Sequence, residues 1–458
     1  MMQILAFLLS LSLLIFLHEL GHFFFARLFK TRVEKFYLFF NPSFSILRAK
    51  RVNGSLKFSW FSKKAPEEWS EDADSTEWGL GWIPLGGYCA IAGMIDETKK
   101  ADDLPSEPQP WEYRSKKAWQ RLLIISGGVI MNFILAVCIF SMIVFSWGDT
   151  YLPLKDVKQG FAFSEKAKEG GFRDGDILIS ANGKELEMRD GILLNNLFMD
   201  FLNARSVLVE REGNLVEINP PREMGMNVIS SKKFPFSAKS FPATIGSVAE
   251  NSEAERIGLI QGDSITKINE TSIASFEEIY PIAQENKNKT ISIEYYHDGQ
   301  MYANTIHLDS TGIIGIQGSD YSKTVTDEYG FFSSFPMGAK FGVQTLKAYV
   351  AQLRFVFTKE GATQIGGFIT IGKIFPKKWN WQTFWNMTAF LSIILAFMNI
   401  LPIPGLDGGH VMFTLYEMVS GRKPSDKFLE RTQMAGMIIL FALLIFANGN
   451  DVIRLFQK

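Results

Sequence analysis

Four long apolar runs alternate with polar stretches along the chain, and they predict its main helices. They cover residues 4–28, 122–147, 384 to about 403, and 434–447. The second run has 26 residues without a charge, which is enough to cross roughly 30 Å of hydrocarbon. The fourth run is short for a membrane span and needs Thr432 and Gln433, or residues after it, to complete the crossing. The pattern predicts a multi-pass α-helical membrane protein with four transmembrane helices.

Basic residues beside these runs set the expected orientation. They are Arg27, Lys30, Arg32 and Lys35 after the first run, Arg114, Lys116, Lys117 and Arg121 before the second, and Arg422, Lys423, Lys427 and Arg431 between the third and fourth. Short basic loops stay in the cytoplasm, whereas long segments cross the membrane regardless of charge. The segment from about 148 to 380 and both termini are therefore expected outside, in the periplasm of a bacterium. A cleaved signal peptide is the alternative for the first run, but "MMQILAFLLS" has no basic n-region.

The long outer segment contains two similar stretches. "GFRDGDILISANGKEL", from Gly171, aligns with "GLIQGDSITKINETSI", from Gly258, at one constant offset. Each joins a Gly-Asp turn to a short strand and an Asn at a second turn, which is hairpin chemistry. The pattern resembles the bacterial PDZ domain and predicts two α+β PDZ-like domains, at 150–230 and 237–318. PDZ domains can accept a C-terminal strand, but a repeat this short is also compatible with a purely structural role.

Two further segments carry aromatic residues suited to a membrane surface. Residues 330–358 mix aromatic side chains with Lys and Arg, and predict an amphipathic helix along the outer surface. "GWIPLGGYCAIAGMIDE", between the first two runs, predicts a glycine-turned, membrane-associated β-hairpin anchored by Trp82 and Tyr88. An unpaired strand edge there can hold an extended peptide through backbone hydrogen bonds.

The first apolar run contains the most informative polar residues. "FLHELGHFFF" places His18, Glu19 and His22 among leucines and phenylalanines. Ionisable groups at membrane depth are costly and tend to be functional. His18 and His22 are four residues apart, so they share a helix face and can bind one metal ion with Glu19 beside it. A chance match to HExxH is the alternative, but it leaves an unpaired carboxylate in hydrocarbon.

A catalytic zinc ion usually has three protein ligands, and the chain offers few candidates for the third. Of the five histidines, His297 and His307 lie in polar, strand-like sequence, and the two cysteines fit no zinc motif. "NILPIPGLDGGH" breaks the third apolar run with prolines and glycines, which is tolerated where the backbone lines a cavity. We therefore predict Asp407 as the third ligand, the alternative being a helix N-cap. His410, three residues on, is expected to support the site rather than bind metal.

The two motifs "HELGH" and "NILPIPGLDGGH" together resemble the site-2 protease family of intramembrane zinc metalloproteases, of the bacterial regulator of sigma-E protease type. The resemblance implies one Zn²⁺ per chain, held by His18, His22 and Asp407. It implies that Glu19 is the catalytic base and that Asn399 contacts the substrate or the oxyanion.

Two other segments support the same resemblance. The hairpin is similar to a membrane-associated hairpin of the family, whose glycines, here Gly86 and Gly87, keep an edge strand close to the active site. "SGGVIMNFILA" resembles the family's second-helix motif. Its Gly127 and Gly128 are best explained by close helix packing, and Asn132 by interhelical hydrogen bonding or support of the zinc site.

The expected activity is that of a metalloendopeptidase in regulated intramembrane proteolysis, as in stress responses. Its substrates would be single-pass membrane proteins, such as anti-sigma factors or remnant signal peptides, that another protease has trimmed. The PDZ-like domains would exclude untrimmed substrates by size and bind the freshly exposed C-terminus. The net charge of −1 gives no sign of a nucleic-acid partner. The alternatives are a catalytically silent PDZ membrane scaffold, a transporter, which the lack of an inverted repeat opposes, and a soluble zincin, which the apolar flanks oppose.

The sequence thus predicts a chain of nine segments in the bacterial inner membrane. They are a first helix with the zinc motif at 1–30, a cytoplasmic loop with the hairpin at 31–120, a second helix at 121–147, PDZ-like domains at 150–230 and 237–318, an interfacial helix and linker at 330–380, a third helix with the Leu-Asp-Gly motif at 384–410, a cytoplasmic loop at 411–433, and a fourth helix with the C-terminus at 434–458.

Overall fold

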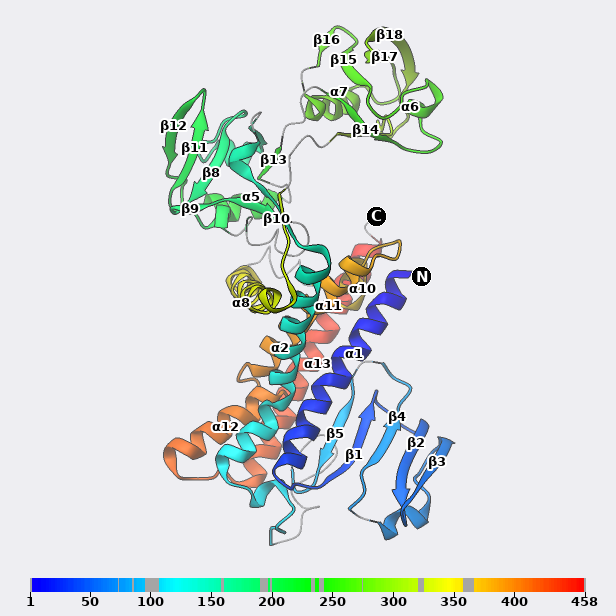
Figure 1. Cartoon of the computed structure of the whole chain (residues 1–458), viewed down its shortest axis with the longest axis vertical. Coiled ribbons are helices and arrows are strands. Elements are labelled where there is room, and N and C mark those ends of the chain that lie inside the picture. The colour runs from blue at the N-terminus through cyan, green and yellow to red at the C-terminus, as the bar shows by residue number, and fades with distance from the viewer. Residues whose placement is uncertain are drawn as a thin grey trace. The chain divides into compact units, whose positions relative to one another are not determined.

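The chain forms two compact units, which we describe separately (Figure 1). The first unit joins Met1–Gly148 to Glu328–Lys458, and the second is Asp149–Asp327. The computed structural model describes residues 2–72, 74–84, 86–94, 107–157, 160–189, 197, 200–231, 235–238, 243–273, 275–319, 325–356 and 366–456.

Among the described residues of the first unit, four helices are long and apolar enough to cross a membrane. They are α1 (Met2–Leu28), α2 (Ala118–Trp147), α11 (Trp381–Ile400) and α13 (Asp426–Phe456). Each predicted span therefore has a helix that corresponds to it. However, α13 begins well before its apolar run, so part of the predicted 411–433 loop is helical. A hydropathy pattern misses these turns because a membrane helix can continue with polar residues beyond the hydrocarbon.

The third apolar run is broken where its prolines and glycines predict a break, so more than one helix occupies the predicted segment 384–410. Helix α11 ends before a short loop, and a new helix, α12 (Asp407–Ser420), begins after it. Pro402 and Pro404 lack the N–H groups that would continue the helical hydrogen bonds. Gly405 has a φ of 91°, a left-handed value that favours glycine. The break makes Asp407 the first residue of a separate helix.

Helices α1 and α2 touch through their backbones. A Cβ at Gly21 would lie 2.2 Å from the carbonyl oxygen of Gly127, and a Cβ at Gly127 would lie 2.5 Å from that of Gly21. Side chains at these positions would force the helices apart, so glycine is what permits the contact. The turn of α1 that carries the two histidines is thereby held against α2.

A five-stranded sheet follows α1, with the strand order β3-β2-β4-β1-β5. Its strands are β1 (Val33–Leu38), β2 (Ser45–Val52), β3 (Ser55–Ser62), β4 (Glu77–Leu80) and β5 (Tyr88–Ile91). The predicted hairpin is wrong, because β5 pairs with β1 and not with the segment just before it. Strand β1 buries Phe36 and Tyr37 and takes the place between β4 and β5. Leu85 and residues 95–97 of the predicted hairpin lie outside the described residues. Among the described strands, β5 is an edge of the sheet.

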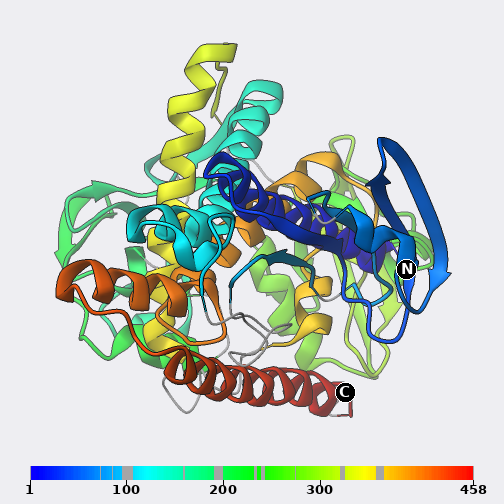
Figure 2. The ribbon, with the colours of Figure 1, turned by 90° about the horizontal axis from the view of Figure 1, so that it is seen from below.

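Two helices occupy the predicted interfacial segment and linker, α8 (Phe331–Val356) and α10 (Phe368–Lys373). Helix α8 packs on α2, as Figure 2 shows for the yellow and cyan helices. The rings of Phe140 and Phe341 lie 6.3 Å apart, edge to face. A Cβ at Gly338 would lie 2.2 Å from Ser141 Oγ. Close packing on α2 therefore fixes α8 within the first unit.

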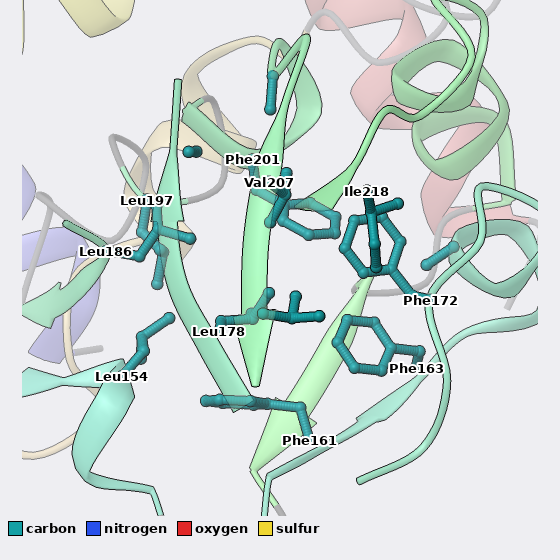
Figure 3. Close-up of a cluster of buried hydrophobic side chains, with 14 of the residues drawn as sticks. Leu154, Phe161, Phe163, Phe172, Leu178, Leu186, Leu197, Phe201, Val207 and Ile218 are labelled. Carbon is teal, nitrogen blue, oxygen red and sulfur yellow. The ribbon is translucent and has the colours of Figure 1, made fainter. Parts of the chain in front are cut away.

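The described part of the second unit has two separate hydrophobic cores. The first gathers side chains between Leu152 and Val228, among them the fully buried Phe161 and Phe201 (Figure 3). The second gathers side chains between Ala243 and Ile314.

The elements of these two cores are short. Those between residues 161 and 238 are β7 (Phe161–Phe163), α3 (Glu165–Lys168), β8 (Ile177–Ala181), β9 (Lys184–Glu185), β10 (Glu187–Arg189), β11 (Val207–Arg211), β12 (Asn214–Ile218), α5 (Met224–Ser231) and β13 (Phe236–Ala238). Those between 245 and 318 are β14 (Ile245–Val248), α6 (Glu253–Arg256), β15 (Ser264–Ile268), β16 (Thr271–Ser272), α7 (Ile279–Glu285), β17 (Thr290–His297), β18 (Gln300–His307) and β19 (Ile316–Gly318).

The repeated sequence builds the same turn in each core. Asp176 and Asp263 are both buried, and each accepts a hydrogen bond from the backbone N–H three residues before it, at 2.9 and 3.0 Å. Asn182 and Asn269 both have a left-handed φ, of 50° and 49°. The repeat therefore reflects two copies of one local structure.

The two ends of the second unit lie side by side. Strand β6 (Asp149–Pro153) pairs antiparallel with β20 (Val325–Asp327), and Asp149 lies opposite Asp327. The chain thus leaves and re-enters the first unit at neighbouring points.

Candidate metal centre

Three side chains from two helices meet at one point in the first unit. His18 Nε2 and His22 Nε2 are 3.3 Å apart, and each lies 3.3 Å from Asp407 Oδ2. The two histidines are 9% exposed. They share a face of α1 because they are one helical turn apart, and the break before α12 brings Asp407 to the same place.

The spacing of these atoms fits a zinc ion. Zn²⁺ is bound tetrahedrally at about 2.0–2.1 Å by His nitrogen and carboxylate oxygen, which puts neighbouring ligand atoms about 3.3–3.4 Å apart. The three donor atoms already have this spacing. Two imidazoles and one carboxylate also form the ligand set of a catalytic zinc site, in which a fourth position stays open for water or substrate.

Hydrogen bonding on the far side of His22 sets its tautomer. Nδ1 lies 2.9 Å from the carbonyl oxygen of Ile124, an acceptor only, so Nδ1 carries the proton and donates it. Nε2 therefore presents a lone pair to Asp407 Oδ2. That oxygen is buried and accepts no hydrogen bond from the described residues. Lone pairs that face each other in this way are repulsive unless a cation lies between them.

His18 has a matching partner in α2. Asn132 is fully buried, and its amide nitrogen is placed 3.1 Å from His18 Nδ1, while its Oδ1 has no partner among the described residues. Turning the amide over lets Oδ1 accept the Nδ1–H of His18 and leaves Nε2 free to bind metal. The backbone carbonyl of Asn132 accepts a 2.7 Å hydrogen bond from Ser392 of α11. Three helices thus contribute to the orientation of one imidazole, and hydrogen-bond partners of this kind orient the histidines that bind metal ions.

A cavity of about 370 Å³ opens beside the three donor atoms. Glu19 lines it, and its carboxylate accepts a hydrogen bond from the backbone N–H of Cys89 in β5. Asn399, near the end of α11, also lines the cavity, with its amide nitrogen 3.5 Å from His18 Nε2. The structure therefore places the predicted base and the predicted oxyanion contact in the same space as the predicted ligands.

The edge of the sheet forms another part of the cavity wall. Gly86 and Gly87 line it just before β5. A Cβ at Gly87 would lie 2.5 Å from the carbonyl oxygen of Tyr37 and 2.9 Å from a methyl group of Ile15. A side chain there would push β5 away from α1, so the glycine keeps the strand edge next to the site.

The other histidines do not contribute donor atoms to this group. His410 lines the cavity but is not among the three converging ligands. His297 and His307 lie in the second unit, where Nδ1 of each has its own partner, Asp263 Oδ1 at 2.7 Å and Thr290 Oγ1 at 3.3 Å.

Two contributors to the site were missed from the sequence. The Ile124 carbonyl is a backbone group, so no residue type in the sequence indicates that it contacts a histidine. Gln433 lines the cavity from α13. As a polar residue at the start of an apolar run it was visible, but we interpreted it only as an extension of the span.

Comparison with known proteins identifies the family. The model of peptidase family M50 matches residues 6–59 and 55–443. A protein of Vibrio cholerae named "Putative zinc metalloprotease" is 26% identical over 98% of both chains. The metalloprotease MmpA of Caulobacter vibrioides is 25% identical over 99% of this chain and 96% of its own. The regulator of sigma-E protease RseP of Escherichia coli is 25% identical over 98% of both chains. With a family match that covers most of its length and a His-His-Asp group that could hold a metal ion, this chain belongs to peptidase family M50, the site-2 proteases.

Proposed function

We propose that this protein is a zinc-dependent endopeptidase that cuts pre-trimmed single-pass membrane proteins within or near the bilayer. One observation carries the proposal. His18, His22 and Asp407 converge with zinc spacing in a cavity that Glu19 shares, and all four belong to or adjoin membrane-length helices. A scaffold without activity has no need of this set.

The residues have distinct roles in hydrolysis. His18, His22 and Asp407 would hold the zinc ion, which when bound acts as a Lewis acid toward water and the scissile carbonyl. Glu19 takes a proton from the attacking water and delivers it to the leaving amine nitrogen, so that the water oxygen ends on the new carboxyl group. The Cys89 N–H keeps the Glu19 carboxylate oriented for both transfers.

The substrate must be extended before it can be cut, because a helix hides its backbone amides. Among the described strands, β5 is an edge of the sheet and lies beside Glu19, so an unwound segment can add to it as a further strand. Gly86 and Gly87 keep this edge close to the ligands. The amide of Asn399 is then placed to donate to the oxyanion that develops at the scissile carbonyl.

The loop charges favour one orientation of the chain in the membrane. We infer that the basic flanks are cytoplasmic and that the second unit and both termini are periplasmic, in the bacterial inner membrane.

The two repeated domains would act as a pair of PDZ-like modules that block bulky untrimmed substrates and bind a freshly exposed C-terminus. Anti-sigma factors and remnant signal peptides are the substrate classes that the family resemblance favours.

Metal removal tests the proposed function directly. We expect purified protein in detergent to hold about one zinc ion per chain and to cut a trimmed single-pass model substrate. Treatment with a strong chelator should stop cleavage, and added zinc should restore it. The measurement pairs metal analysis with gel-based cleavage rates. A folded wild-type protein that neither binds zinc nor cuts would instead support the silent scaffold.

Removal of the second unit tests its role in substrate selection. Because β6 and β20 bring its ends together, Asp149–Asp327 can be replaced by a short Gly-Ser linker of about four residues. The shortened enzyme should keep its zinc and cut an untrimmed substrate, which the full chain leaves intact. The same shortened chain with Glu19→Gln serves as the control. Continued dependence on trimming would contradict the size-exclusion role.

A further inference from the structure

A buried amide on α13 has no function in the chemistry described above. Gln433 is 8% exposed and lines the same cavity as His18 and Asp407. Its Oε1 is buried and has no hydrogen-bond partner among the described residues. Burying an unpaired amide oxygen is unfavourable. Its position in a largely apolar helix therefore suggests that its partner arrives with a ligand.

Close packing holds Gln433 at this place. Three residues along α13, a Cβ at Gly436 would lie 1.6 Å from the carbonyl oxygen of Pro404, in the loop between α11 and α12. Residues three apart share a helix face. The contact that only glycine permits at 436 therefore turns Gln433 toward the segment that carries Asp407. Residues of α1 and Gln433 of α13 both line the cavity.

An extended peptide in this cavity would have backbone N–H and C=O groups that cannot form hydrogen bonds with β5. In a strand added to an edge, every second residue turns its N–H and C=O toward that edge, and the residues between turn theirs away. Away from water, the outward groups also need partners. A glutamine side chain has an acceptor oxygen and an NH₂ donor in one plane. It can therefore pair with an N–H and a C=O of the peptide backbone together.

We propose that Gln433 binds the backbone of the unwound substrate on the side that faces away from β5. The proposal rests on the proposed proteolytic function and adds to it a second line of backbone recognition. Because Gln433 pairs with peptide groups, its contribution is independent of the substrate side chains. It fits a protease that accepts different membrane segments once they are extended.

The test replaces Gln433 by leucine, which keeps the size of the side chain and removes its hydrogen-bonding groups. The variant should hold as much zinc as wild type and cut a trimmed single-pass substrate with kcat/KM lowered about 5- to 100-fold, since a substrate peptide group is left unpaired. Its thermal unfolding midpoint should not fall, because the glutamine oxygen has no hydrogen-bond partner in the part of the protein that the structure describes. A purely structural role predicts a lower midpoint, and that result would overturn the proposal.

Substrates in which one peptide bond is replaced by an ester can identify the backbone group that pairs with Gln433. Each ester removes one N–H donor. With wild type, one position facing away from β5 should slow cleavage, and Gln433→Leu should show no further loss there, which is the signature of a direct interaction. Thr432→Val is the matched control, because the Thr432 hydroxyl donates only to its own helix, to the Phe428 and Leu429 carbonyls. If wild type cuts and Gln433→Leu cuts equally well, this inference fails and the protease proposal stands. If wild type neither binds zinc nor cuts, the protease proposal fails first.

Discussion

Replacing Glu19 by glutamine is expected to slow cleavage by about 10²- to 10⁴-fold, the usual contribution of a general base, while zinc content stays at the wild-type level. Glutamine has nearly the same shape and still accepts the Cys89 N–H through its carbonyl oxygen. It cannot take a proton from water. The loss should therefore appear in kcat, with little change in KM, when cleavage of the trimmed substrate is followed over a range of concentrations.

Asp407→Ala provides the contrast that assigns these roles. Removing one of three ligands should release the metal, so this variant should lose zinc and activity together. Added zinc should not restore Glu19→Gln. If Glu19→Gln loses its zinc, or if Asp407→Ala keeps both zinc and activity, the assignment of base and ligand is wrong.

Substitution of Gly128 by alanine is expected to abolish zinc binding and cleavage, although it adds a single methyl group. That Cβ would lie 2.4 Å from His18 Cε1 and 2.6 Å from His22 Nε2. The methyl group would displace both imidazoles from their positions around the metal. Alanine favours a helix over glycine by about 1 kcal/mol, so a loss of function cannot be attributed to weaker helix formation.

The matched control is Gly449→Ala in α13, where nothing lies within 4 Å of the added Cβ. It should keep full zinc content and activity. Both variants should be expressed in the membrane and purified alike, with metal analysis and cleavage measured side by side. A Gly128→Ala protein that retains one zinc ion per chain would show that α2 does not pack on the histidines as closely as described.

The local part of the site could be predicted from the sequence. Four-residue spacing on a helix is enough to place His18 and His22 on one face, and prolines in an apolar run are enough to indicate a broken helix near Asp407. The contacts of the imidazoles could be predicted only in part. Asn132 was noticed as a polar residue in an apolar run, but its pairing with His18 joins residues 114 apart. Such pairing depends on how α1 and α2 pack and has no local signal.

The order of the strands in the five-stranded sheet could not be predicted from the sequence either. The glycines before β5 suggested a local turn, and local turns predict hairpins. In the structure β1 separates β4 from β5, and its parallel pairing with β4 joins Lys35 to Glu77. Two parallel strands are not joined by a tight turn, so no short sequence motif indicates that they pair. An edge strand beside the site was predicted as part of a hairpin, and among the described strands β5 is such an edge through a different topology.

The adjacency of β6 and β20 has a consequence for how such a protein can change in evolution. For the membrane-embedded frame, the insertion between Gly148 and Glu328 begins and ends at almost the same point. Its size and content are therefore nearly independent of the geometry around the metal. Domains can be added to this insertion, duplicated or exchanged without moving the residues around the metal site. The repeated turn at Asp176 and Asp263 is what a duplication in this position would leave behind.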